Sequence, residues 1–155
     1  MPIELPDFQL PNFDEKYDEK IAKSLEGSTD FAGGLMRFLG IRHVEVGAGV
    51  LVAEIDMRDE LKTPAGNLHG GALAALCDHV LGTVCYPVMV RGAWAATTEF
   101  KLNYLAPVTE GTLRATAQII SMTRRTAVVR IDVVNGDRLV CTAQGTVLLM
   151  EPKPK

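Results

Sequence analysis

A histidine, two glycines and a carboxylate stand close together in the longest apolar segment of this 155-residue chain. His69, Gly70 and Gly71 follow a run of turn-forming residues, Thr63-Pro64-Ala65-Gly66-Asn67. If a helix begins at His69 or Gly70, its first N–H groups have no partner within the helix and lie at the positive end of its dipole. Because glycines lack Cβ, a ligand oxygen has room to approach these donors, which would stabilise a carbonyl oxygen during acyl transfer. A glycine-rich helix start chosen only for packing would have the same sequence.

Asp78 is the one formally charged residue of the helix candidate over residues 68–88. The bulky face of this helix, which would pack on a sheet, consists of Leu73, Leu76, Val80 and Val84. The positions three and four residues away from Asp78 are mostly small: Ala74, Ala75, Leu81 and Gly82. An unpaired carboxylate in an apolar helix is costly, so it has either a function or a partner such as a buried arginine or a backbone N–H. His79 lies about 100° around the helix and is expected to be a packing or surface residue.

The spacing of Gly70 and Asp78 constrains how they could act together. They are eight positions apart, which corresponds to about 12 Å along a helix at about 1.5 Å per residue. A catalytic group must lie within about 3 Å of the atom it serves. If both residues act on one substrate, they must therefore come from different chains, and a symmetric dimer with antiparallel central helices would form two such sites.

Hydrophobic periodicity predicts one folded domain over residues 31–150, an acidic arm over 1–30 and a disordered tail over 151–155. Helices are expected over 15–26, from a cap at Asp30 to Leu39, and over 68–88. The expected strands are one long strand over 44–57 with a glycine irregularity, then 94–105, 112–122, 126–134 and 138–150. This order favours an α+β fold, in which a curved antiparallel sheet wraps around one long central helix, with short N-terminal helices.

Composition and charge exclude several classes of protein. The net charge is −3, and residues 1–30 hold three lysines and eight acidic residues, a balance of −5. The remaining residues therefore carry +2, which is too little for the basic surface that nonspecific nucleic-acid binding requires. Cys77, Cys85 and Cys141 show no metal-ligand spacing, and their odd number without a secretion signal indicates free thiols in the cytoplasm. The apolar window 70–90 has Asp78 at its middle, which predicts a buried helix and no membrane association.

The chain resembles the hotdog-fold thioesterases, in particular the phenylacetate-pathway (PaaI-like) and 4-hydroxybenzoyl-CoA-type acyl-CoA thioesterases. The resemblance covers about residues 35–150 and is most specific at His69-Gly70-Gly71 and Asp78, within TPAGNLHGGALAALCDHVLG. It implies the hotdog fold and hydrolysis of a CoA thioester with an aromatic or a short to medium acyl group. It also implies that Asp78 is the general base or nucleophile, that Gly70 polarises the thioester carbonyl and that His69 shapes the turn. Since thioester hydrolysis requires no metal or cofactor, none is expected.

The resemblance implies further roles around the reacting carbonyl. The family often has Asn six positions before the histidine, where this chain has Thr63, while Asn67 lies two positions before it. Thr97 matches a Ser or Thr that often contacts the catalytic water, and Thr98 follows it. Strict alternation, however, places Thr97 on the polar face of its strand with Glu99.

The substrate is expected to contact residues on both sides of the helix candidate. Arg124 and Arg125 match a basic turn that the family often has, which would contact the phosphates of CoA, although such a pair is more often a solvated turn. The acyl pocket is expected to be lined by the small face of the helix, by Leu81 and by Tyr104 or Trp94. Further residues expected to contact the substrate are Asn67, Gly71 and Thr98. The expected partners are an acyl-CoA and a second copy of the chain, with dimer and tetramer both open.

Three other readings remain open for the same segment. The first is a noncatalytic acyl-CoA binder on the same fold, although an acidic arm of 30 residues is short for the DNA-binding module of such regulators. The second is a hydratase, whose Asp and His are several residues apart, whereas Asp78 and His79 are adjacent. The third is a purely structural homodimer module.

Overall fold

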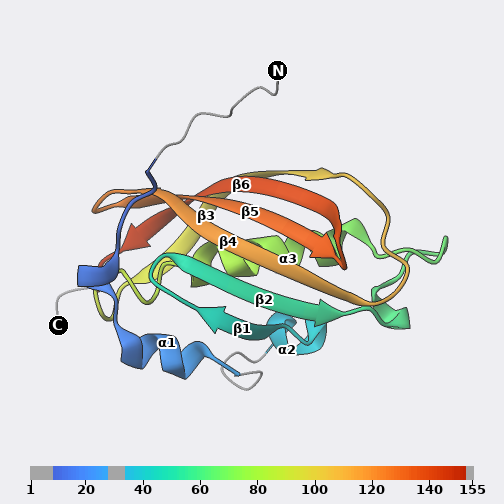
Figure 1. The fold of residues 1–155 in the computed structure, drawn as a ribbon, viewed down its shortest axis with the longest axis horizontal. Coiled ribbons are helices and arrows are strands. Elements are labelled where there is room, and N and C mark those ends of the chain that lie inside the picture. Colours follow the sequence, from blue (N-terminus) through green and yellow to red (C-terminus); the bar gives the residue numbers. More distant parts are fainter. Residues whose placement is uncertain (1–8, 28–33, 153–155) are drawn as a thin grey trace.

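The computed structural model describes residues 9–27 and 34–152 (Figure 1). Its helices are the 3-10 turns η1 (Asp14–Lys16) and η2 (Asp59–Leu61) and the α-helices α1 (Glu19–Leu25), α2 (Leu35–Leu39) and α3 (Gly70–Thr83). Its strands are β1 (Arg42–Val46), β2 (Val50–Asp56), β3 (Trp94–Tyr104), β4 (Thr112–Met122), β5 (Thr126–Asn135) and β6 (Arg138–Met150). The expected cap Asp30 and residues 153–155 of the expected tail lie outside the described residues.

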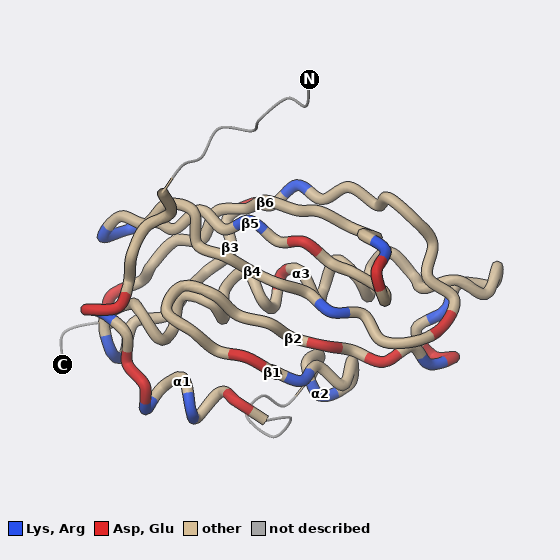
Figure 2. Tube along the Cα trace, viewed as in Figure 1, with Lys and Arg blue, Asp and Glu red and all other residues tan. Residues whose placement is uncertain are grey.

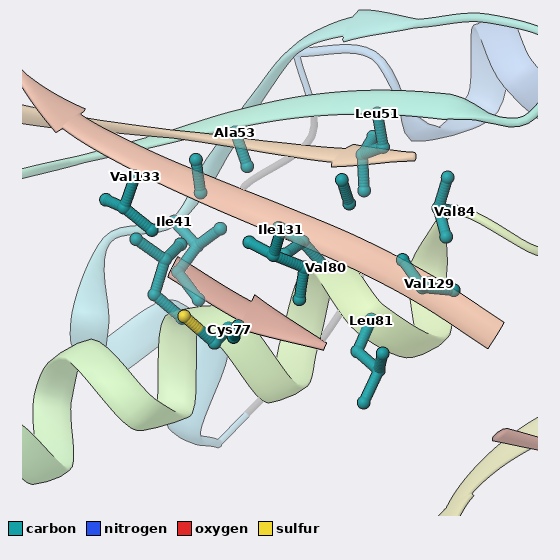
Figure 3. Close-up of a cluster of buried hydrophobic side chains, with 14 of the residues drawn as sticks. Ile41, Leu51, Ala53, Cys77, Val80, Leu81, Val84, Val129, Ile131 and Val133 are labelled. Atoms are coloured by element: carbon teal, nitrogen blue, oxygen red, sulfur yellow. The ribbon is translucent and has the colours of Figure 1, made fainter. Parts of the chain in front are cut away.

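The strands form one antiparallel sheet in the order β1-β2-β4-β5-β6-β3. The sheet lies across α3, the long central helix (Figure 1). Alternate residues of β5 point toward the apolar side chains of α3 in the core (Figure 3), namely Val129, Ile131 and Val133. The expected curved sheet around one central helix is confirmed, and the strands β3 to β6 begin and end within one residue of the expected positions.

The expected long strand over 44–57 is wrong, because the chain reverses at its glycines. β1 and β2 pair antiparallel, and Gly47 N–H donates to the carbonyl of Val50 at 2.8 Å. Gly49 has a φ of +81°, in the left-handed region that favours glycine. A Cβ there would lie 2.5 Å from the ring of Phe13, so the same glycine also makes room for a side chain of the arm.

The central helix is shorter than expected at its C-terminal end. α3 ends at Thr83, and residues up to Met89 continue as turns in which Val88 N–H donates to the carbonyl of Cys85 at 3.1 Å. Pro87 has no N–H and disfavours helical geometry at the residue before it. The helix therefore cannot continue to position 88.

The described part of the N-terminal arm, residues 9–27, packs on the domain. The expected helix over 15–26 is divided, because Asp18 caps α1 by accepting from the N–H groups of Lys20 and Ile21 at 3.0 and 3.2 Å. Phe13 and Leu25 are buried in the core. The domain boundary at residue 30 remains a prediction. Side chains of the arm are nevertheless part of the same core as the predicted domain over residues 31–150.

Charged residues gather away from the central helix (Figure 2). They lie along α1, within the strands and at the turns between strands, whereas Asp78 is the one Asp, Glu, Lys or Arg within α3. Within the described ranges 9–27 and 34–152, no helix has the length and apolar composition required to cross a membrane. Cys77, Cys85 and Cys141 are buried free thiols.

Candidate active site

The central helix has one face that its own sheet covers and one face that it leaves open. The covered face holds the buried side chains Leu73, Leu76, Cys77, Val80 and Leu81. On the other face Gly71 and Asp78 are exposed, and the small residues Ala74, Ala75 and Gly82 are partly buried. Asp78 has no hydrogen-bond or ion-pair partner within residues 9–27 and 34–152. The alternative of a buried, paired Asp78 is therefore not found in the described part of a single chain.

The start of α3 leaves one amide available as a donor. His69 is the N-cap, and its ring Nδ1 accepts the N–H of Gly71 at 2.8 Å. The backbone carbonyl of His69 accepts from Ala72 and Leu73 at 3.0 and 3.3 Å. The N–H of Gly70 has no acceptor among the described residues. The geometry thus singles out Gly70, since the side chain of His69 occupies the N–H of Gly71.

The turn before α3 is held by bonds that involve both polar candidates. Thr63 N–H donates to the carbonyl of Asn67 at 2.7 Å, and Thr63 Oγ1 donates to Asn67 Oδ1 at 3.2 Å. His69 N–H donates to the carbonyl of Leu61 at 2.7 Å, which fixes the turn to η2. Thr63 and Asn67 therefore shape the loop that presents Gly70.

A cavity of about 400 Å³ opens beside Gly70. Its lining is mostly apolar and comes from the turn, the first turns of α3 and the segment after β3: Asn67, Leu68, Gly70, Leu73, Tyr104, Leu105, Ala106, Pro107 and Val108. The phenol of Tyr104 lies directly against Gly70, where a Cβ would meet its Oη at 2.9 Å. The space beside Gly70 Cα is thus filled by a side chain of the protein, whereas sequence reasoning left it open for a ligand.

A β-bulge in β3 decides which threonine faces the helix. The pairing of β3 with β6 shifts between Thr97 and Glu99, so Thr98 is the additional residue. Thr97 pairs with the buried Val147, and directly paired residues lie on the same face of a sheet. The expectation that Thr97 shares the polar face with Glu99 is therefore wrong, because the bulge turns Thr97 toward α3. Thr98 Oγ1 donates to the carbonyl of Thr146 at 2.9 Å and holds the bulge.

Leu81 and the two arginines lie apart from this cavity. Leu81 is fully buried in the core, 2.9 Å from the position of a Cβ on Gly145. Arg124 and Arg125 form the exposed turn between β4 and β5, as the sequence indicated. Arg124 Nε donates to Glu151 at 2.9 Å, and its side chain borders a second cavity of about 480 Å³ with a mainly apolar floor.

Two histidines form a buried pair that the sequence did not reveal. His43 Nε2 lies 2.8 Å from His79 Nε2, and His43 Nδ1 lies 2.9 Å from the carbonyl of Leu25. A carbonyl only accepts, so His43 donates from Nδ1 and accepts the Nε2–H of His79. Burial lowers the pKa of His43, and it lowers the pKa of His79 to about 4. The available signal was slight: His43 lies two positions after the apolar Ile41 at the start of a strand.

Comparisons with known proteins place the chain in a family. The chain matches the family model of the thioesterase superfamily over residues 65–142, about half of its length. The 1,4-dihydroxy-2-naphthoyl-CoA hydrolase of Listeria monocytogenes is 26% identical over 121 residues, covering 77% of this chain and 98% of that protein. The solved structure of the conserved protein PA5202 from Pseudomonas aeruginosa has a TM-score of 0.74 and 32% identity, covering 77% of this chain and 95% of that one. The E. coli PaaI protein from the phenylacetic acid degradation operon has a TM-score of 0.69 and 25% identity, covering 74% of this chain and 83% of that one.

The family match spans the turn, the whole of α3 and the strands up to the middle of β6, and thus both Gly70 and Asp78. The sheet order around α3 is that of the hotdog fold. The chain therefore belongs to the thioesterase superfamily.

Proposed function

We propose that the chain is an acyl-CoA thioesterase that hydrolyses CoA thioesters of aromatic or short to medium acyl groups. One observation carries this proposal: among the described residues, Asp78 is exposed and unpartnered on the open face of α3, and the N–H of Gly70 has no acceptor at the start of the same helix. The first group supplies a base or nucleophile, and the second supplies a donor to an oxyanion. These are the two functions that thioester hydrolysis requires.

Each site is completed by a second copy of the chain. Gly70 and Asp78 lie on one continuous helix, about 12 Å apart at about 1.5 Å per residue. Within residues 9–27 and 34–152, β3 is an edge strand of the sheet and has β6 as its one neighbour. An edge strand has unpaired N–H and C=O groups that another strand can take up. Two-fold pairing of the β3 edges would set the open faces of two α3 helices against each other, with Gly70 of one chain near Asp78 of the partner subunit.

The reaction follows from these two groups. As a base, the carboxylate of Asp78 takes a proton from water while the water oxygen attacks the thioester carbon. The carbonyl oxygen becomes negative and is held by the N–H of Gly70. The C–S bond then breaks, the acid forms and CoA leaves as a thiol once it has taken up the proton. As a nucleophile, the same carboxylate would attack the thioester carbon, the C–S bond would break with CoA leaving as the thiolate, and water would hydrolyse the resulting anhydride to the acid and the free carboxylate.

The position of Thr97 supports a role beside the reacting water. Its pairing with the buried Val147 places it on the face of β3 that lies toward α3. There its hydroxyl would contact the water or the carbonyl. His69 and Thr63 support the same site indirectly, because they shape the turn that presents Gly70.

CoA is held at the β4–β5 turn in this proposal. Arg124 and Arg125 give this turn two positive charges, and phosphates are anions that arginine binds in a fixed geometry. The names of two related proteins favour an aromatic acyl group, since one is a 1,4-dihydroxy-2-naphthoyl-CoA hydrolase and one comes from a phenylacetic acid degradation operon. We place the reaction in the cytoplasm, where the three buried thiols would stay reduced.

A thiol-release assay tests the proposal. The purified chain is given a panel of aromatic and aliphatic acyl-CoA esters, with Asp78→Asn as the control. The proposal predicts turnover of at least one aromatic or short to medium ester, lost in the control. Tight binding of acyl-CoA with no release of thiol by either protein would instead indicate a noncatalytic binder.

A further inference from the structure

Tyr104 contacts Gly70 from the far end of β3. Its Oη donates a hydrogen bond of 2.8 Å to the backbone carbonyl of Gly70. Tyr104 pairs with the buried Cys141, so its side chain points to the helix side of the sheet. Tyr104 as a residue is nevertheless 55% exposed, and it borders the cavity of about 400 Å³ beside α3. Burial alone therefore does not explain its position.

The ring also accounts for the glycine at position 70. A Cβ on Gly70 would lie 2.9 Å from both Cζ and Oη of Tyr104 and 3.3 Å from Cε1. Gly70 and Tyr104 thus fit each other: the absent Cβ lets the phenol lie against the backbone. Any larger side chain at position 70 would push the phenol away.

Two side chains hold the first peptide groups of α3 from opposite directions. His69 Nδ1 accepts the N–H of Gly71, and Tyr104 Oη donates to the carbonyl of Gly70, so both ends of the peptide group between Gly70 and Gly71 are held. The carbonyl of His69 is held by Ala72 and Leu73. Among the backbone N–H groups of residues 70–73, the first turn of α3, that of Gly70 is then the one without an acceptor in the described part of the chain.

The geometry points to Tyr104 as a positioning residue for thioester hydrolysis. Its bond holds the peptide group between Gly70 and Gly71, and with it the α-carbon next to the Gly70 N–H. The inference rests on the proposed function, in which that N–H holds the carbonyl oxygen. A donor of this kind contributes most when it is already aligned before charge develops, because no reorganisation is then required during the reaction. Tyr104 touches neither water nor base in this role and acts through Gly70.

The test compares two Tyr→Phe variants of the full chain. Tyr104→Phe removes the bond to Gly70 and keeps the ring. Tyr17→Phe is the matched control, since Tyr17 Oη donates a similar bond of 3.0 Å to the carbonyl of Val46, far along the chain from α3. We expect Tyr104→Phe to lower kcat about tenfold, the effect of about one hydrogen bond, with KM changed less than about twofold. Tyr17→Phe is expected to leave kcat unchanged.

A second pair of variants tests the fit of the ring to the glycine. Gly70→Ala is expected to lower kcat about 100-fold, because it displaces the phenol and the amide. Combined with Tyr104→Ala, which removes the ring, it is expected to be no slower than Tyr104→Ala alone. If the two substitutions lowered kcat independently, the double variant would show the product of their separate effects. That result would contradict the fit between Gly70 and the ring of Tyr104.

The outcomes separate this inference from the proposed function. Activity that depends on Asp78, with equal kcat for Tyr104→Phe and Tyr17→Phe, overturns the role of Tyr104 and leaves the proposed function standing. A fall in thermal stability with unchanged kcat in Tyr104→Phe also overturns it, since the residue would then be structural. A wild-type chain that releases no thiol overturns both.

Discussion

At the scale of single residues, the candidate site is defined by the polar groups that have no hydrogen-bond or ion-pair partner as much as by those that have one. His69 occupies the N–H of Gly71, so Gly70 keeps the available donor. Asp78 has no partner in the described ranges and faces outward from α3. Carboxylates in apolar helices are usually paired, and the open face of α3 explains why a single chain tolerates this one.

Replacement of Asp78 tests its part in the chemistry. Asp78→Asn keeps the shape of the side chain and removes the charge, so we expect kcat to fall by about 10² to 10⁴. The melting temperature is expected to stay the same or rise, because no described residue loses a partner. Asp137→Asn, at the exposed β5–β6 turn, serves as the control and is expected to keep full activity. Turnover near the wild-type rate in Asp78→Asn would remove this residue from the mechanism.

Charge reversal tests the arginine turn. Arg124→Glu with Arg125→Glu is expected to raise KM for an acyl-CoA by about tenfold or more, and to change KM for a short acyl thioester without the nucleotide much less. Steady-state kinetics on the two substrates measure this difference. Lys20→Glu with Lys23→Glu, on α1, changes the net charge equally and controls for long-range effects. Equal changes in KM for both substrates would place CoA elsewhere.

At the scale of elements, the sequence predicted type and order better than local irregularities. Alternation located β3 to β6, because half-buried strands repeat every two residues. It could not locate the bulge at Thr98, since one additional residue changes the face of Thr97 without changing the composition of the strand. It also merged β1 and β2, because Gly47, Ala48 and Gly49 interrupt an apolar pattern only briefly.

Contacts between distant segments were beyond the reach of sequence reasoning. Gly70 and Asp78 were found because both lie in one helix, at a spacing that the sequence itself displays. Tyr104 and Gly70 meet across the fold, as do His43 and His79, and no periodicity in one segment encodes these pairs. Sequence reasoning therefore identified the chemical groups and the turn residue His69, and missed the bonds that Tyr104, His43 and His79 make across the fold.

The histidine pair links three elements and predicts a pH dependence of stability. His43 in β1 bonds both to Leu25 in α1 and to His79 in α3. Histidine in the unfolded chain titrates near about 6.5, whereas burial lowers the pKa of His43, and of His79 to about 4. Between these values the unfolded chain binds more protons than the folded one. The contribution of the two neutral histidines to stability is therefore fully present above about pH 6.5. As the pH falls toward about 4, the free energy of unfolding decreases by up to about 1.4 kcal/mol per pH unit for each histidine.

Denaturant unfolding at a series of pH values measures this slope. His79→Gln keeps an N–H donor for His43 and does not titrate, so its slope between about pH 6.5 and 4 is expected to be shallower than that of the wild type. His69→Gln changes an exposed histidine and is the control for stability alone. An equal slope in His79→Gln and in the wild type would show that the histidine pair binds the same number of protons in the folded chain as in the unfolded chain.

At the scale of the whole molecule, the proposed function requires a second copy of the chain. One side of the sheet ends at β3, an exposed strand with one neighbour, and the small-residue face of α3 beside it carries Asp78. The helix separates the donor from the carboxylate, so in the proposed dimer each chain would hold half of each of two sites. A two-fold partner would complete both sites and would also cover the open strand edge. Dimer and tetramer are both compatible with this proposal, because each would contain the proposed β3–β3 contact.

The measurement that tests the shared site most directly is the activity of a mixed dimer. Asp78→Asn and Gly70→Ala chains with different affinity tags are expressed together, and dimers that carry both tags are purified. One site then combines an intact Gly70 with an intact Asp78, and the other site has neither. We predict that the mixed dimer regains up to half of the wild-type activity, while each parent dimer stays low. A mixed dimer no more active than its parents would contradict a site shared between two chains.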